Sequence, residues 1–144
     1  MMKKNGFTLI ELLVVISIIG ILVAVSIFGL SGARESARDA RRKSDLELIR
    51  SGLELYRADC NSYPATITIG SSLVGSGTPT TCSASNTYIS LIPDDPITAS
   101  RDYDYRTIGN GFELYASLEQ QGLSTLTAPG ISCVTSCNYM ITNP

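Results

Sequence analysis

The sequence contains no histidine and no tryptophan, and its four cysteines form no Cys-x-x-Cys pair. Without histidine the chain lacks the commonest metal ligand and the commonest general base. Without a Cys-x-x-Cys motif it lacks the usual ligand spacing of a zinc site. Proline does not occur before Pro64, and no charged residue occurs between Leu12 and Leu30. No nucleophile–base pair or phosphate-binding loop is recognisable, so we expect no enzyme and no cofactor.

The composition limits the architecture to one domain and an anchor. The chain has 144 residues and a formal net charge of -2. After an apolar segment at the N-terminus, roughly 110 residues remain, enough for one helix packed on one sheet. The slight negative charge argues against a protein that coats nucleic acid.

The longest apolar run begins at Phe7 and ends at Leu30, with Glu11 as its one charged residue. As a helix this run of about 24 residues is roughly 36 Å long, whereas a bilayer core is about 30 Å thick. Lys3 and Lys4 precede it, which predicts a cytoplasmic N-terminus with the remaining chain outside. An acid in such a segment costs on the order of 3 kcal/mol, so Glu11 requires an explanation.

The run Lys3-Lys4-Asn5-Gly6-Phe7-Thr8-Leu9-Ile10-Glu11 resembles the processing site of type IV prepilins and pseudopilins. The resemblance implies that a prepilin peptidase removes residues 1–6 by cutting after Gly6. It also implies that Phe7 becomes an N-methylated N-terminus. Glu11 matches the family acid that pairs with the N-terminal amine of an adjoining subunit. The implied partners are further copies of the chain, the peptidase, a pilus assembly platform and the inner membrane.

Two other interpretations of this segment are possible. A secretory signal peptide has a shorter apolar region, although Ser31-Gly32-Ala33 is an acceptable cleavage site. A membrane anchor that is never cut would explain the apolar run. Neither interpretation explains Gly6, Phe7 and Glu11 together, so we favour a prepilin.

Residues 33–60 are predicted to continue the helix beyond the membrane. Apolar residues recur there every three or four positions, which predicts a face that holds a sheet. This stripe consists of Leu46, Ile49, Leu53, Tyr56 and Cys60, widened by Leu48 and Leu55. Opposite charges also recur three or four apart, in the pairs Glu35–Arg38, Asp39–Lys43, Lys43–Glu47 and Arg50–Glu54. Small residues at Ala33, Ala37, Ala40 and Ser44 predict a second face against neighbouring copies.

The basic residues of this helix allow two interpretations. Arg38, Arg41, Arg42 and Lys43 are interleaved with Asp39 and Asp45. We favour a solvated, salt-bridged face over a nucleic-acid surface, because acids alternate with the bases. Nucleic acid therefore remains a partner that these charges do not support.

We predict an α+β fold in which the long N-terminal helix packs on a small antiparallel sheet. The domains are residues 1–6 (leader), 7–32 (membrane and assembly helix) and 33–144 (head). Within the head, the helix covers 33–60, a loop 61–90 and the sheet region 91–144. Asn61 is predicted as a left-handed helix cap before Pro64. Strands are expected at Thr66–Ile69, on both sides of the turn Gly109-Asn110-Gly111, and at Asn138–Thr142.

Four aspartates near the expected sheet are weak candidates for a metal site. The segment 93–118 resembles the sheet region of major pseudopilins, a family that often binds calcium in a later loop. Here the acids after Leu118 are reduced to Glu119, which makes such a site doubtful. The remaining oxygen ligands would be Asp94, Asp95, Asp102 and Asp104. Turn capping and surface charge are the favoured explanation of these four residues.

The four cysteines suggest two disulfides, because the segment outside the membrane meets an oxidising environment. Three pairings are possible. We prefer Cys60 with Cys82 and Cys133 with Cys137, which would tie the helix end to the loop and close a small loop before the last strand. A catalytic thiol is not expected, since no histidine can activate one.

The function expected from these observations is a structural subunit of a type IV pilus, for adhesion, motility or DNA uptake. The precursor would wait in the cytoplasmic membrane and the assembled pilus would be extracellular. The alternative is a pseudopilin of a type II secretion system, and a membrane-anchored enzyme or receptor is less favoured. The Ser/Thr-rich segment 65–90 and the missing calcium acids tip the choice to the pilus. In a filament, any melted segment of the helix is predicted between Gly20 and Gly32.

Overall fold

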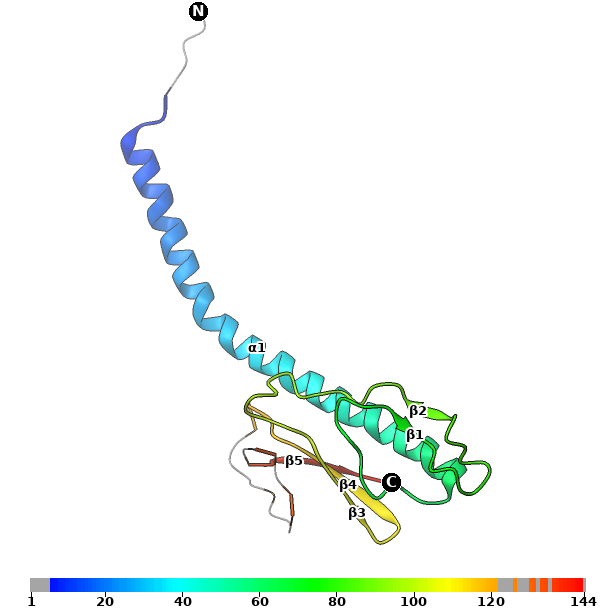
Figure 1. Ribbon diagram of the computed structural model, residues 1–144. Helices are drawn as coiled ribbons and strands as arrows, with labels where there is room; N and C mark the ends of the chain where they lie inside the picture. The colour runs from blue at the N-terminus through cyan, green and yellow to red at the C-terminus, as the bar shows by residue number, and fades with distance from the viewer. Residues whose placement is uncertain (1–5, 122–125, 127–129, 132, 135, 144) are drawn as a thin grey trace, which may run out of the picture. The chain divides into compact units, whose positions relative to one another are not determined.

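A computed structural model describes residues 6–121, 126, 130–131, 133–134 and 136–143. It confirms the α+β class: one long helix is followed by short antiparallel strands (Figure 1). The helix α1 covers Leu9–Cys60. The strands are β1 (Leu73–Val74), β2 (Thr87–Ile89), β3 (Asp104–Ile108), β4 (Gly111–Ala116) and β5 (Tyr139–Thr142). The chain divides into two compact units, residues 1–36 and 37–144, which are described separately below.

In the first unit, α1 leaves its apolar side chains uncovered on every side. From Phe7 to Leu30, the large apolar side chains whose exposure the structure gives have exposed fractions of 48% or more. A helix that is apolar all round needs lipid or other protein chains to cover it. This is the behaviour predicted for the membrane and assembly segment.

In the second unit, α1 buries one stripe against the sheet. The stripe consists of Leu46, Ile49, Leu53, Tyr56 and Cys60, as predicted. The predicted widening of the stripe is wrong, because Leu48 and Leu55 are 48% and 59% exposed. At about 100° per residue, both leucines lie more than about 100° round the helix from the centre of the stripe.

The main sheet has the order β3-β4-β5, with all pairs antiparallel. The hairpin between β3 and β4 pairs Ile108 with Gly111, so Gly109 and Asn110 form its two-residue loop. Gly109 has a φ of 55°, a conformation that glycine adopts without strain. Phe112 and Leu114 of β4 are buried in the core with the helix stripe. The predicted hairpin and last strand are therefore confirmed.

The loop predicted for residues 61–90 contains a small sheet of its own. β1 and β2 pair within it, beside the last part of α1 (Figure 1). The strand predicted at Thr66–Ile69 is wrong: Ile67 and Ile69 pack against the core, but the segment has no strand partner. Gly52 of α1 lets β2 approach closely, because a Cβ there would meet the side chain of Ile89.

The helix ends as the sequence predicts. Asn61 has a φ of 59°, and its backbone N–H donates to the carbonyl of Arg57 at 2.8 Å. This left-handed cap satisfies a carbonyl of the last turn before Pro64 prevents continuation.

Candidate functional site

The first unit begins with a reciprocal cap between Thr8 and Glu11. The backbone N–H and the hydroxyl of Thr8 donate to the Glu11 carboxylate at 2.8 and 2.7 Å. The backbone N–H of Glu11 donates in return to the Thr8 hydroxyl at 3.3 Å. This is a capping box, and the negative carboxylate is also stabilised by the positive end of the helix dipole. The role of Thr8 was not predicted, although its Thr-x-x-Glu spacing is typical of a capping box.

The carboxylate of Glu11 borders an apolar hollow on the helix surface. The hollow has a volume of about 370 Å³ and is lined by Phe7, Ile10, Glu11, Val14 and Val15. The Phe7 side chain is 90% exposed, and Gly6 stands before it with open space around its Cα. The three residues predicted for cleavage, methylation and assembly therefore adjoin one exposed surface. Cleavage after Gly6, methylation of Phe7 and assembly through Glu11 stay predictions.

By length and composition, α1 is able to cross a membrane. The qualifying apolar stretch lies near the N-terminus, and none of it is buried within the chain. An exposed apolar helix of this kind fits a membrane-anchored precursor.

In the second unit, a buried arginine on α1 gathers three carboxylates from three segments. Arg42 is fully buried and donates to both oxygens of Asp95, at 2.6 and 3.0 Å. It also donates to Asp39 and to Glu119, each at 2.7 Å. Arg38 adds a bidentate ion pair with Glu119. One guanidinium thereby joins three segments: the start of this helix half, the turn at residues 94–97 and the segment after β4.

The Asp39 carboxylate extends this cluster to the backbone. It accepts hydrogen bonds from the backbone N–H groups of Glu119 and Gln120 at 2.9–3.1 Å. The carboxylate of Asp95 likewise accepts from the backbone N–H of Ile97 at 2.7 Å. Buried charges persist when each is paired and hydrogen-bonded in this way.

The cluster shifts the pKa values of Glu119 and Arg42. The hydrogen bond from Arg38 is the main reason that the pKa of Glu119 falls from 4.5 to about 2; Arg42 adds to this and burial opposes it. For Arg42, burial works against the charge. The hydrogen bonds to Asp95, Glu119 and Asp39 outweigh burial and raise the Arg42 pKa above its ordinary value. Arg42 and Glu119 therefore remain charged at neutral pH.

This cluster corrects two interpretations of the sequence. The basic run was predicted to be solvated, but Arg42 is the largest fully buried side chain in the described residues. Two predicted helix pairs also have other partners, since Asp39 binds Arg42 and Glu47 binds Arg50. The sequence offered little warning, because Asp95 and Glu119 lie 53 and 77 residues from Arg42.

The four candidate metal ligands do not converge. Asp95 is buried against Arg42, whereas Asp94, in the same turn, is exposed. The carboxylate of Asp102 accepts from the backbone N–H of Tyr103, and Asp104 lies on β3. Within the described residues, no three acids or cysteines are placed to hold a metal ion.

The cysteines pair as predicted from the sequence. Cys60 is bonded to Cys82, which joins the last residue of α1 to the segment between β1 and β2. Cys133 is bonded to Cys137, and both pack against Tyr115 of β4. The first bridge fastens the segment between β1 and β2 to the helix, whereas the second closes a short loop that packs on the sheet.

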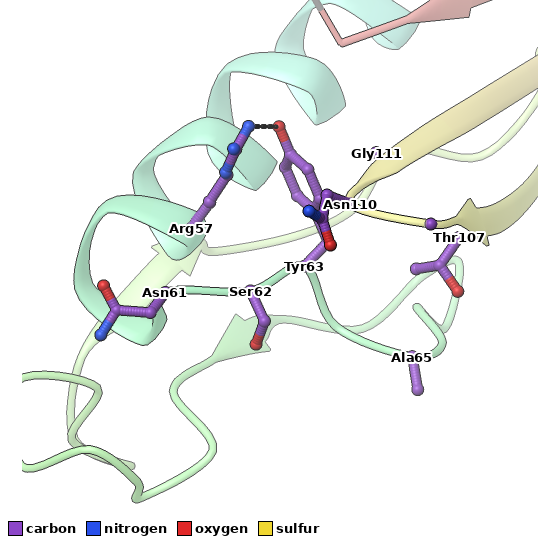
Figure 2. Close-up of a pocket in the computed structure, with 9 residues that line it drawn as sticks. Arg57, Asn61, Ser62, Tyr63, Ala65, Thr107, Asn110 and Gly111 are labelled. Carbon is purple, nitrogen blue, oxygen red and sulfur yellow. Dashed lines mark hydrogen bonds between the residues drawn. The ribbon is translucent and has the colours of Figure 1, made fainter.

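A polar cavity of about 350 Å³ lies where α1 ends and the β3–β4 hairpin turns. Its lining includes Arg57, Asn61, Tyr63 and Asn110 (Figure 2). The Arg57 guanidinium donates to the Tyr63 hydroxyl at 3.0 Å, and that hydroxyl donates to Glu54 at 2.8 Å. The hydrogen bond with Tyr63 is the main reason that the pKa of Arg57 is raised.

Comparison with known proteins covers both units. Residues 1–30 match the family model "Prokaryotic N-terminal methylation motif", and residues 30–123 match "Type II secretion system (T2SS), protein G". No solved structure gives a significant match.

The curated relatives carry the same description, "Type II secretion system core protein G". The chain is 36% identical to the Escherichia coli (strain K12) protein over 97 residues, 65% of this chain and 67% of that protein. It is 33% identical to the Vibrio cholerae protein over 114 residues, 76% of this chain and 75% of that protein. The match to the Aeromonas hydrophila protein has 39% identity over 64 residues and covers 45% of that protein.

These matches confirm the pilin and pseudopilin resemblance and favour the secretion alternative over the type IV pilus. They also support the prediction that the chain is not an enzyme, since the relatives are core proteins of a secretion system. With a prepilin-type N-terminus, a continuous apolar helix and an α+β head, the chain belongs to the protein G family of type II secretion systems.

Proposed function

We propose that this chain is the pseudopilin of a type II secretion system, a subunit that polymerises into a short filament and helps to move folded proteins outward. The match of residues 30–123 to protein G is the observation that carries this proposal. The Ser/Thr-rich loop and the missing calcium acids predict a type IV pilus instead. Neither feature distinguishes the two systems as directly as a match over the head.

The proposed maturation follows the N-terminal sequence. A prepilin peptidase cuts after Gly6, so that residues 1–6 are a leader and Phe7 becomes an N-methylated terminus. Residues 7–32 hold the precursor in the inner membrane and later form the filament interior. Residues 33–144 form the head. An assembly platform in the membrane lifts each processed subunit onto the filament.

Assembly through α1 follows from what the helix leaves uncovered. The exposed apolar side chains of the first unit exchange lipid for the helices of neighbouring copies. Glu11 is then removed from water, where an unpaired carboxylate is costly and a cationic partner stabilises it. The amine of Phe7 on an adjoining copy supplies that partner. The Thr8 cap holds the Glu11 carboxylate until the amine arrives.

The second unit offers a continuation of this interface along α1. Ala37, Ala40 and Ser44 are exposed, and the two exposed leucines, Leu48 and Leu55, follow on the same side of the helix. Small residues permit close approach of a second helix, and the leucines add apolar area. We assign this surface to contacts between neighbouring copies.

Deletion of the gene in the source strain tests the proposal. A pseudopilin predicts that exported enzymes and other secreted proteins accumulate in the periplasm, while surface pili and twitching motility are unchanged. Complementation with the wild-type gene should restore secretion. Mass spectrometry of the membrane fraction should then find the chain beginning at N-methylated Phe7.

A type IV pilus predicts the opposite pair of results. Secretion would continue without the gene, and the processed chain would dominate material sheared from the cell surface. A chain that still carries Met1, or one that begins near Ala33, would overturn both interpretations.

A further inference from the structure

Arg57 lines the polar cavity, and its own chain gives it an electrostatic interaction with Glu54, relayed through the Tyr63 hydroxyl, but no direct ion pair in the described residues. Within the described residues it forms one hydrogen bond, to Tyr63, and stacks over that ring at 5.1 Å from its centroid. No ion pair of Arg57 occurs in this part of the chain. A guanidinium has five N–H donors, so most of its capacity to bind an anion is unused. The cavity beside it, about 350 Å³, is larger than a carboxylate side chain.

At the other end of this helix half, a turn presents an acid outward. In Pro93-Asp94-Asp95-Pro96, Asp95 is 2% exposed and binds Arg42 through both oxygens. Its neighbour Asp94 is exposed. Two prolines and a buried ion pair fix the backbone of the turn, so Asp94 is held ready for a partner at little further cost in entropy.

Asp94 differs from the other acids of the head in having no partner. Among the described acids of residues 37–143, it is the one without a hydrogen bond or an ion pair. It cannot reach Arg57 within its own chain. Arg42, which holds the turn, lies fifteen residues before Arg57 on α1, a separation of about 22 Å along the helix.

We propose that Asp94 of one copy enters the cavity of a neighbouring copy and pairs there with Arg57. The inference rests on the proposed assembly into a filament. When the α1 helices of neighbouring copies run in the same direction, a shift along the filament brings the Asp94 end of one head beside the Arg57 end of another. A contact between two different surfaces repeats from copy to copy and extends without closing, as a helical filament requires. Bidentate pairing of the carboxylate with the guanidinium fixes the register of the heads.

Cross-linking between introduced cysteines tests the contact directly. The full chain carrying Arg57→Cys and Asp94→Cys is assembled in cells and treated with a short bismaleimide. The expected product is a ladder of covalent oligomers, because each chain offers both halves of the contact. Ala58→Cys with Asp94→Cys is the matched control. Ala58 is exposed and adjacent in sequence, but lies about 100° round the helix, away from the cavity lining.

Charge reversal supplies a second readout that does not need new thiols. Arg57→Glu and Asp94→Arg should each reduce filament yield by about fivefold, because like charges then meet in a partly enclosed site. The double variant should recover most of the wild-type yield. Recovery would also show that neither change prevents folding, and mass spectrometry of the two native disulfides checks this for each single variant.

The outcomes separate this inference from the proposed function. A ladder from the 57/94 pair and rescue by the double reversal support the contact. If wild-type filaments form but the 57/94 pair gives no more oligomer than the 58/94 pair, the contact is wrong while the pseudopilin assignment stands. If the wild-type chain is processed and never forms filaments, the proposed function fails and the contact fails with it.

Discussion

The two halves of α1 share one helix but meet different surroundings. From Leu9 to about Ser36, apolar side chains point in every direction, and among those whose exposure the structure gives, none of the large ones is buried by the chain. From Ala37 to Cys60, the helix has one buried stripe, a buried arginine and an exposed face. A helix needs only local hydrogen bonds and suitable residues to continue, so one element can serve two tasks. The first half depends on lipid or other copies for its cover, whereas the second half carries the head.

The largest effect on head stability is expected from removing the buried guanidinium in the second half of α1. Arg42→Met should lower the free energy of unfolding of the head by about 3–5 kcal/mol, because Asp39 and Asp95 lose the charge that compensates them. Guanidinium-induced unfolding of the full chain in detergent, followed by tyrosine circular dichroism, measures this loss.

Arg41→Met is the matched control for Arg42→Met. The Arg41 side chain is 65% exposed and lies 3.8 Å from Asp45. Its removal should change the free energy of unfolding by less than about 1 kcal/mol, as is typical for an exposed ion pair. Equal losses from the two variants would mean that the buried cluster does not hold the head together.

Two leucines in the second half permit an equally narrow comparison. Leu46 is fully buried and Leu48 is 48% exposed. Leu46→Ala should cost about 2–5 kcal/mol through lost burial and a cavity. Leu48→Ala should stay within about 0.5 kcal/mol in the isolated chain, since it removes no internal contact of that size.

In the assembled filament, Leu48 should contribute to stability although it contributes little to the isolated head. If Leu48 lies between copies, Leu48→Ala should reduce filament yield while the isolated head unfolds at the same denaturant concentration. Unchanged yield would exclude Leu48 from the interface.

These two leucines also show where prediction from sequence reached its limit. Spacing of three and four identified the buried stripe, because apolar periodicity reports which face meets a sheet. The spacing did not exclude Leu48 and Leu55. Their apolar side chains suit a core, but their angular position around the helix does not. A leucine exposed in one chain and covered in an assembly has the same sequence signal as a core leucine.

Arg42 escaped prediction for a different physical reason. A run of alternating charges is typical of a solvated helix, and the partners of Arg42 come from distant turns. Only tertiary packing brings Asp95 and Glu119 to this point. The hairpin and the Asn61 cap were predictable because their signals are local, and the two short strands β1 and β2 were not, since they hold two and three residues.

Acid should weaken the head at the Glu119 ion pairs, with a smaller effect than the loss of Arg42. The folded pKa of Glu119 is about 2, against an ordinary value of 4.5. Because the folded pKa is the lower one, the stabilisation is complete above pH 4.5 and is lost as the pH falls towards 2. Unfolding measured from pH 6 to pH 2 should show this loss, and Glu119→Gln should make the curve flatter. A curve of unchanged slope in that variant would contradict the assignment.

Removal of divalent cations should have the smallest effect of all. The three carboxylates are already held by the guanidinium groups of Arg42 and Arg38 and by backbone N–H groups. Excess EDTA should therefore leave the unfolding midpoint of the head unchanged, with calcium added back as the control. A lower midpoint in EDTA, restored by calcium, would show a metal contribution that the Arg42 cluster does not explain.

The most direct test of the division between the two halves is the Glu11→Ala variant, scored for processing, head stability and filament yield together. The account predicts normal cleavage after Gly6, N-methylated Phe7 and unchanged unfolding of the head. It predicts few or no filaments and secreted proteins retained in the periplasm, because the Phe7 amine of a neighbouring copy has lost its carboxylate. Normal filaments and normal secretion from this variant would contradict the account.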